Sequence, residues 1–160
     1  MQEYFHSVTL NRDKCTGCTN CIKRCPTEAI RVRDGKARII KERCIDCGEC
    51  IRVCPHHAKT AVTDPLEAKN AYRYSIAMPA PTLYGQFKNA GDIGYILGAI
   101  KKLGFDDVFE TSVGADIVSQ YTRKIILRQK RPRPLISSAC PAVVRLIQVR
   151  FPAFTDNIIN

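Results

Sequence analysis

Residues 15–26 have the sequence CTGCTNCIKRCP, and residues 44–55 have the sequence CIDCGECIRVCP. Each stretch places four cysteines in the pattern Cys-x2-Cys-x2-Cys-x3-Cys-Pro, and the second copy follows the first at an offset of 29 residues. The match extends beyond cysteine, because Ile22 corresponds to Ile51 and Pro26 corresponds to Pro55. An internal repeat of this length indicates a duplicated structural unit.

The cysteine spacing has a chemical reason. Three cysteines at steps of three form a tight loop that can present three sulfurs to three irons of a cubane 4Fe–4S cluster. The fourth cysteine follows on a short helix that points towards the other copy, so such runs ligate crosswise. The spacing therefore predicts two 4Fe–4S clusters. The first is expected on Cys15, Cys18, Cys21 and Cys54, and the second on Cys44, Cys47, Cys50 and Cys25.

Zinc and disulfides are the alternative uses of clustered cysteines. Structural zinc sites usually space two pairs of ligands rather than two runs of four. Disulfides need an oxidising compartment, and residues 1–7 lack the basic start and apolar stretch of a secretory signal. The longest apolar run, Tyr95–Ile100, is too short for a membrane helix, which needs about 20 residues. We therefore expect a cytoplasmic protein, away from the membrane, whose thiols bind metal.

The charge balance bears on the kind of partner. The chain has 25 Lys and Arg against 15 Asp and Glu, a formal net charge of +10. Two thiolate-bound clusters of about −2 each would reduce this to about +6. A basic surface can steer an acidic redox partner protein towards the chain. The basic residues do not alternate with aromatic ones in a nucleic-acid-binding motif, so we expect no nucleic-acid partner.

The duplicated motif resembles the bacterial two-cluster ferredoxin over roughly residues 4–64. This resemblance implies an α+β ferredoxin-like two-cluster domain at residues 1–64. Two short strand candidates, Ser7–Leu10 and Lys59–Val62, flank the motif and could pair.

A hairpin is predicted between the two cysteine runs. Ile30–Arg33 and Ala37–Ile40 alternate apolar with basic residues around Asp34-Gly35, which is a hairpin turn signal. The alternation predicts one buried face and one basic, exposed face. We favour a solvated surface over a docking surface for the basic face.

The remainder of the chain differs in pattern. Residues 65–74 have the composition of a linker. Residues 75–160 alternate strand and helix signals, which favours an incomplete α/β domain with a mainly parallel sheet. The expected strands are Ser75–Met78, Asp107–Glu110 and Leu135–Ser138, and the expected helices are Asp92–Gly104, Ala115–Lys130 and Ala142–Arg150.

Three passages in this segment resemble the start of the catalytic domain of iron-only (FeFe) hydrogenases. They are GAIKKLGFDDVFET at residues 98–111, GAD at residues 114–116 and SSACP at residues 137–141. Residues 75–154 fit that domain in order, and in that family a ferredoxin module commonly precedes it. The resemblance implies that this chain is the N-terminal part of a longer protein, because the family supplies further cluster cysteines from later motifs.

The family's first active-site motif usually has the sequence Thr-Ser-Cys-Cys-Pro. Its second cysteine ligates the cubane part of the hydrogen-activating cluster, a role that the resemblance assigns to Cys140 in a longer parent chain. Its first cysteine relays protons, and Ala139 stands at that position. Because alanine has no titratable group, it cannot relay protons in this way. The replacement resembles the sensory branch of the family and not its high-turnover branch.

Three functions remain open from the sequence. The chain could be an electron-transfer module, part of a hydrogenase, or part of a hydrogen sensor with a signalling partner. For this chain we favour the electron-transfer module, because only its ligand set is complete, and we expect no hydrogen turnover from the chain alone. For a longer parent chain, Ala139 favours a hydrogen sensor or a low-activity hydrogenase.

Overall fold

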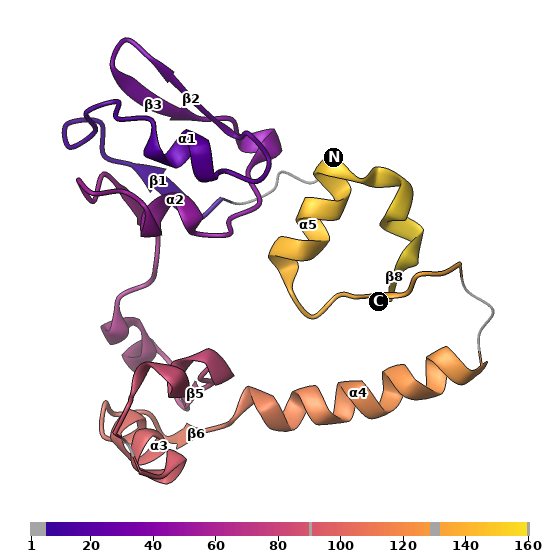
Figure 1. The fold of residues 1–160 in the computed structure, drawn as a ribbon. Coiled ribbons are helices and arrows are strands. Elements are labelled where there is room, and N and C mark those ends of the chain that lie inside the picture. Colours follow the sequence, from indigo (N-terminus) through magenta and orange to yellow (C-terminus); the bar gives the residue numbers. More distant parts are fainter. Residues whose placement is uncertain (1–5, 90, 129–131, 160) are drawn as a thin grey trace. The chain divides into compact units, whose positions relative to one another are not determined.

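Four two-stranded sheets and five α-helices make up the part of the chain that the structure describes, residues 6–89, 91–128 and 132–159 (Figure 1). The structure is a computed structural model. The chain divides into two compact units. One comprises Met1–Thr63 with Arg131–Asn160, and the other comprises Asp64–Lys130.

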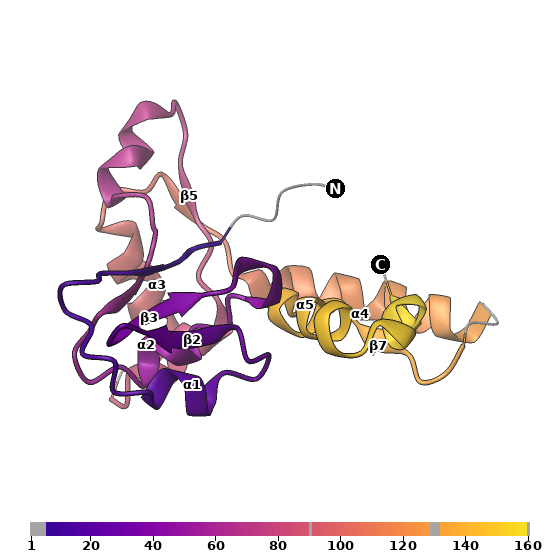
Figure 2. The same cartoon turned by 90° about the horizontal axis from the view of Figure 1, so that it is seen from above.

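Two antiparallel strand pairs enclose the cysteine runs. Strand β1 (Val8–Leu10) pairs with β4 (Lys59–Ala61), and β2 (Ile30–Arg33) pairs with β3 (Lys36–Ile39). Both pairings confirm the prediction from sequence, although β1 and β4 are each one residue shorter than expected and β3 begins one residue earlier. Helices α1 (Asn20–Arg24) and α2 (Glu49–Arg52) pack against each other beside these strands (Figure 2).

The β2–β3 hairpin has the two faces that its alternation predicts. Asp34 and Gly35 have φ angles of 52° and 69°, the left-handed conformation that a tight two-residue hairpin turn requires. Ile30 and Ala37 are buried on one face, whereas Arg31, Arg33 and Arg38 are exposed on the other. The buried face contributes to a core that also includes Cys15, Cys21 and Ala58.

The backbone repeats the duplication of the sequence. Three pairs of residues 29 positions apart all adopt left-handed φ angles between 46° and 73°. These pairs are Gly17 with Asp46, Thr19 with Gly48, and Glu28 with His57. Because most residues avoid this region, the recurrence indicates that both cysteine loops follow the same path.

The C-terminal part of the first unit forms a small motif. Helix α5 (Pro141–Arg150) and a 3₁₀ segment (Pro152–Asn157) connect β7 (Ile136–Ser137) to the parallel strand β8 (Ile158–Ile159). The Asn157 side-chain amide donates to the carbonyl oxygens of Pro132 and Pro134 over 3.2 and 2.7 Å.

The second unit contains α3 (Ile93–Lys101), the parallel strands β5 (Ile76–Ala77) and β6 (Asp107–Val108), and α4 (Thr111–Arg128). Helix α3 lies within the predicted helix Asp92–Gly104, and Asp92 caps it, since its carboxylate accepts the Gly94 N–H over 3.1 Å. A 3₁₀ segment, Leu66–Ala71, occupies most of the predicted linker.

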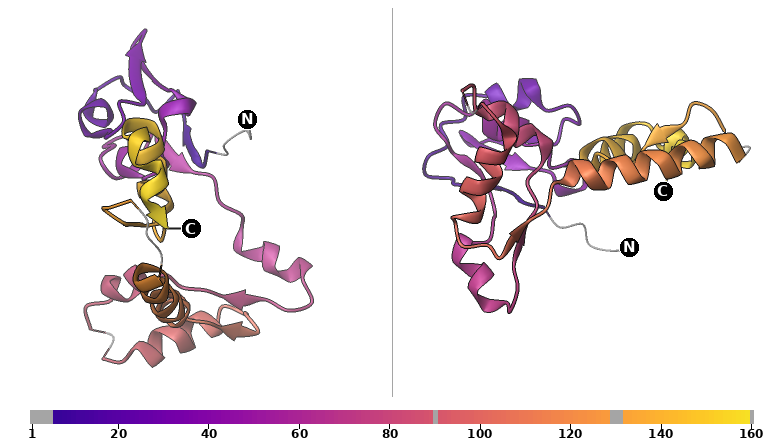
Figure 3. Two further views of the ribbon diagram at one scale, coloured as in Figure 1. Left: turned by 90° about the vertical axis from the view of Figure 1, so that its right-hand side faces the viewer. Right: turned by 90° about the horizontal axis from the view of Figure 1, so that it is seen from below.

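The long helix α4 is uninterrupted (Figure 3), and none of its described side chains is buried. Its predicted last residue, Lys130, lies outside the described residues. None of the helices in the described ranges is both long enough and apolar enough to cross a membrane.

The strands expected after residue 74 form at the predicted places but are only two residues long. They give two separate parallel pairs, β5–β6 and β7–β8, rather than the single sheet that the sequence predicts. Alternation of strands and helices indicates parallel pairing but does not specify which strands become neighbours. The parallel direction is therefore observed, and the single sheet stays a prediction.

Candidate metal centre

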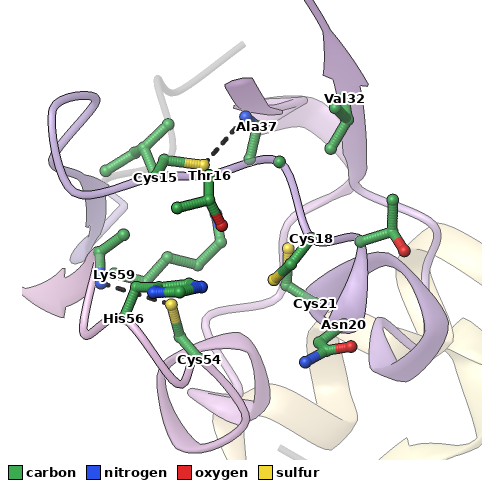
Figure 4. A pocket seen from close by; sticks show the side chains of 14 residues that line it. Cys15, Thr16, Cys18, Asn20, Cys21, Val32, Ala37, Cys54, His56 and Lys59 are labelled. Atoms are coloured by element: carbon green, nitrogen blue, oxygen red, sulfur yellow. Dashed lines mark hydrogen bonds between the residues drawn. The ribbon is translucent and has the colours of Figure 1, made fainter. Parts of the chain in front are cut away.

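Four cysteines that are far apart in the sequence line one pocket. Figure 4 shows Cys15, Cys18 and Cys21 of the first run together with Cys54 of the second run around this space. Cys15 and Cys18 belong to the loop after β1, Cys21 lies in α1, and Cys54 follows α2. These are the four residues that the spacing predicts for one cluster.

The first cysteine loop fits closely against the hairpin. Gly17 has a φ angle of 71°, and a Cβ atom at this position would lie 2.5 Å from the Gly35 carbonyl oxygen. Only glycine avoids both the strained conformation and the contact. The loop is thereby held beside β3, whose Ala37 N–H donates to Cys15 Sγ over 3.4 Å.

Backbone amides also donate to the fourth cysteine of each run. The Ala29 N–H donates to Cys25 Sγ over 3.2 Å, and the Ala58 N–H donates to Cys54 Sγ over 3.3 Å. These two contacts are 29 residues apart, so they are equivalent in the repeat. Hydrogen bonds of this kind stabilise negative charge on sulfur and influence the potential of a bound cluster.

In the second predicted set, Cys25 and Cys44 interact electrostatically across the two runs. Burial raises the pKa of the Cys44 thiol, and the charge of Cys25 adds to this rise. Burial likewise raises the pKa of the Cys50 thiol to about 11, although the positive charge of Lys59 opposes this rise. Cys25 of the first run therefore lies close enough to affect a cysteine of the second run, as crosswise ligation predicts.

Burial and hydrogen bonding have opposite effects within the first set. The Ala37 N–H lowers the pKa of Cys15, whereas burial raises the pKa of Cys21. Lys59 opposes the rise at Cys21 through its positive charge. Thiols with raised pKa values are protonated at neutral pH, so metal binding at this site would release protons.

The cysteine pattern does not predict the environment of Asp46. Its carboxylate accepts the N–H groups of Ser7 and Val8, each over 3.3 Å, and lies 3.4 Å from His6 Nδ1. With Cys44, these side chains form a three-residue group of metal-ligand types. Because the carboxylate already accepts two backbone amides, we assign Asp46 to positioning β1 beside the second cysteine run.

Lys59 is the other residue that sequence reasoning missed. The strand pattern does not predict its burial, yet it lines the cysteine pocket and is 2% exposed. The repeat does indicate the burial of Lys59, because the residue 29 positions earlier is the buried Ile30. His56 also lines the pocket.

Cys140 is separate from this arrangement. It is exposed at the N-cap of α5 and is not one of the residues that line the cysteine pocket. The N–H of the neighbouring Ala139 donates to Ser137 Oγ over 3.3 Å. Cys140 therefore lies apart from the four cysteines that line the pocket.

Family models match both parts of the chain. Residues 7–55 match the 4Fe-4S dicluster domain, and residues 41–72 match a 4Fe-4S binding domain. Residues 73–160 match the C-terminal domain of the iron-only hydrogenase large subunit. The cysteine region therefore binds two 4Fe–4S clusters and is an electron-transfer module.

Curated relatives agree with these matches. The chain is 31% identical to the periplasmic iron hydrogenase large subunit of Nitratidesulfovibrio vulgaris, over 92% of this chain and 39% of the relative. It is 28% identical to iron hydrogenase 1 of Clostridium pasteurianum, over 99% of this chain and 32% of the relative. A shorter match, 44% identical over 32 residues, is to ferredoxin-3 of Desulfocurvibacter africanus.

These relatives set limits on two earlier expectations. One of them is periplasmic by name, so a cytoplasmic location stays a prediction. Neither hydrogenase relative is named as a sensor, and the sensory alternative is not favoured. The chain spans about two fifths of one relative and one third of the other. With more than half of its length matched by the domain model, the chain belongs to the iron-only hydrogenase large-subunit family.

Proposed function

We propose that the two cysteine runs hold the clusters crosswise and that electrons pass through this pair to or from a hydrogen-activating site in the family's catalytic domain. One cluster is held by Cys15, Cys18, Cys21 and Cys54, and the other by Cys44, Cys47, Cys50 and Cys25. The supporting observation is the pocket that combines three cysteines of the first run with Cys54 of the second.

The chemistry of the donor set fits the proposed group. Each set offers four thiolates, the soft ligands that iron–sulfur clusters take. A 4Fe–4S cluster, when bound, accepts and releases one electron at a time. The chain supplies hydrogen bonds to sulfur from Ala37, Ala29 and Ala58. Burial of Cys15 and Cys21 limits the access of water.

Electron entry is favoured where the site approaches the surface. Cys18 and Cys47 are exposed, and they occupy the same position in the two repeats. The other six cysteines of the runs are buried or half-buried. We therefore place electron exchange with partners at the edges formed by these two cysteines.

We also propose that the partner is acidic and docks on the exposed face of the β2–β3 hairpin, in place of the solvated surface favoured from the sequence. Arg31 lies opposite Arg38, and Arg33 lies opposite Lys36. Like charges directly opposite each other destabilise a strand pair, and an anionic partner would relieve that repulsion. The hairpin also contacts the site, because the Lys36 ammonium donates to the Cys15 carbonyl over 2.7 Å.

The domain arrangement belongs to the same proposal. Residues 1–64 would form the two-cluster domain, residues 65–74 a linker, and residues 75–160 the beginning of the hydrogenase domain. Nine cysteines without a disulfide in the described structure are compatible with a reducing cytoplasm.

Crosswise ligation is tested by single replacements in the reconstituted chain. We expect about eight irons and eight sulfides in the parent chain. Cys54→Ala should damage the cluster on Cys15, Cys18 and Cys21. Cys25→Ala should damage the cluster on Cys44, Cys47 and Cys50. Cys140→Ser is the matched control and should retain all the iron.

Electron paramagnetic resonance of the reduced variants separates the two clusters. The proposal predicts that Cys54→Ala and Cys25→Ala remove different signals, whereas Cys54→Ala and Cys15→Ala affect the same one. If Cys54→Ala and Cys44→Ala affect the same signal, the ligand assignment is wrong. About four irons, or stoichiometric zinc, in the parent chain would contradict the two-cluster function itself.

A further inference from the structure

Lys59 is a buried lysine that lies beside the cysteine pocket. It opens β4 and is 2% exposed. Among the described residues, none accepts a hydrogen bond from its Nζ atom, which is itself inaccessible to solvent. Burying an ammonium group is costly unless an opposite charge compensates it. The compensating negative charge must therefore come from the cysteine pocket that Lys59 lines and from the group bound there.

A site for such a negative charge lies next to Lys59. Lys59 lines the pocket formed by Cys15, Cys18, Cys21 and Cys54 (Figure 4). A 4Fe–4S cluster bound by four thiolates has a net charge of about −2, because the thiolates outweigh the iron–sulfide core. A cluster in this pocket would provide the anion that the ammonium group lacks.

The internal repeat makes Lys59 unusual. The equivalent residue in the first copy is Ile30, which is 2% exposed like Lys59. Both residues lie in strands, Lys59 opposite Leu10 and Ile30 opposite Ile39. The two halves of the site therefore share a backbone path but differ in charge at this buried position, and also at the half-buried Asp46, whose equivalent is Gly17. Two clusters in these surroundings would experience different electrostatic fields.

We propose that Lys59 tunes the two-cluster site, raising the reduction potential of the cluster on Cys15, Cys18, Cys21 and Cys54 above that of the other cluster. This inference rests on the proposed ligand sets. On reduction, the cluster gains one electron from the external reductant, and no thiolate bond forms or breaks. Its charge changes from about −2 to about −3. The buried ammonium stabilises the more negative state, so the electron resides preferentially on this cluster.

The test compares Lys59→Ile, which copies the first repeat, with Lys59→Gln, which retains a polar side chain. Lys14→Ile is the matched control, because Lys14 is exposed and adjacent to Cys15. Each reconstituted chain is titrated with dithionite at controlled potential, and the reduced clusters are followed by electron paramagnetic resonance. Iron and sulfide are counted in the same samples.

We expect both Lys59 variants to keep eight irons and to lower one of the two midpoint potentials. The reduced-to-oxidised ratio of that cluster should fall about tenfold at fixed potential, which corresponds to about 59 mV for one electron. The Lys14 control should change much less, because solvent screens an exposed charge. The Cys54→Ala and Cys25→Ala spectra identify which signal belongs to which cysteine set.

The possible failures are distinguishable. Unchanged potentials at full iron content, or equal shifts in Lys59→Ile and Lys14→Ile, would overturn the role of Lys59 while leaving the two-cluster function intact. A larger shift of the cluster on Cys44, Cys47 and Cys50 would overturn it as well. A shortage of iron in the parent chain would instead contradict the proposed function. If the Lys59→Ile chain does not assemble its clusters, the midpoint potentials of Lys59→Gln decide whether Lys59 has this role.

Discussion

Gly17 lies directly against Gly35, so close that a Cβ atom on Gly17 would be 2.5 Å from the Gly35 carbonyl oxygen. This contact joins the first cysteine loop to the hairpin turn, and both residues have left-handed φ angles. The cysteine pocket therefore depends on a backbone-to-backbone approach as well as on the cysteines themselves.

The first prediction compares two glycines in equivalent backbone conformations. Gly17 and Gly48 have φ angles of 71° and 73°, but only a Cβ on Gly17 would meet other atoms. Gly48→Ala should lower the free energy of unfolding by about 1–2 kcal/mol through backbone strain alone. Gly17→Ala should lower it clearly more and should loosen the cluster on Cys15. Cluster bleaching in urea measures the stability of both variants, and equal urea midpoints would contradict the predicted clash of the Gly17 Cβ atom.

A second prediction concerns acid stability in the unit Asp64–Lys130. The Ser75 N–H and hydroxyl donate to Asp106 Oδ2 over 2.7 and 3.0 Å. These hydrogen bonds, the backbone one first, hold the pKa of Asp106 below its ordinary value. A lowered pKa in the folded state gives stability that is present above the unfolded pKa and is lost as pH falls through the folded one. Protection of the β5–β6 amides from hydrogen exchange should therefore decrease below about pH 4.

Asp106→Asn should weaken that pH dependence, because an amide has no charge to lose. Asp107→Asn is the matched control, since it removes the same charge one residue away and leaves the hydrogen bonds of Ser75 intact. The same acid dependence in Asp106→Asn as in the parent would show that another group is responsible.

The third prediction tests how Asp46 positions β1. Its carboxylate accepts the Ser7 and Val8 amides, and its own φ angle is 51°. Asp46→Ala should lower the free energy of unfolding by about 1–3 kcal/mol through the loss of these charged hydrogen bonds, in addition to the effect of backbone strain. Asp34→Ala controls for the strain, because Asp34 has a φ angle of 52° and is exposed at the hairpin turn. Hydrogen exchange at Ser7 and Val8 should increase only in Asp46→Ala.

The sequence predicts the cysteine region in considerable detail, because its signals are local. The Asp34-Gly35 turn and the alternation around it specify the hairpin register. The 29-residue repeat specifies two equivalent loops, and the structure contains both. Lys59 could not be predicted from local pattern, because an exposed lysine and a buried one look alike in a short strand. Only the comparison with Ile30 distinguishes them.

The segment after residue 74 was less predictable for a related reason. Helix α3 begins at the expected cap, Asp92, because capping is a local interaction. Strand neighbours are determined by contacts between distant residues, and two-residue strands contain few of them. Exposed apolar side chains on α4, such as Ile117 and Leu127, also show that amphipathic periodicity alone does not determine burial.

The last prediction concerns the basic face of the hairpin. Arg33 and Arg38 are exposed and line one surface groove with Arg31 and Lys41. If an acidic redox protein docks there, its association should be accelerated by attraction that salt screens over about 10 Å at 0.1 M. We therefore expect the double variant Arg33→Gln/Arg38→Gln to accept electrons from a reduced acidic ferredoxin roughly tenfold more slowly at low salt.

The double variant Lys88→Gln/Lys102→Gln removes the same charge from exposed positions in the other unit and is the matched control. Stopped-flow reduction of each variant should give rates that converge as salt increases, because only the encounter step depends on the hairpin charges. The potentials of the clusters should be the same in both variants, which separates docking from the tuning role of Lys59. Equal slowing in the two double variants would mean that net charge, and not the hairpin, directs the partner. A rate that is insensitive to salt in the parent chain would exclude electrostatic docking on this face.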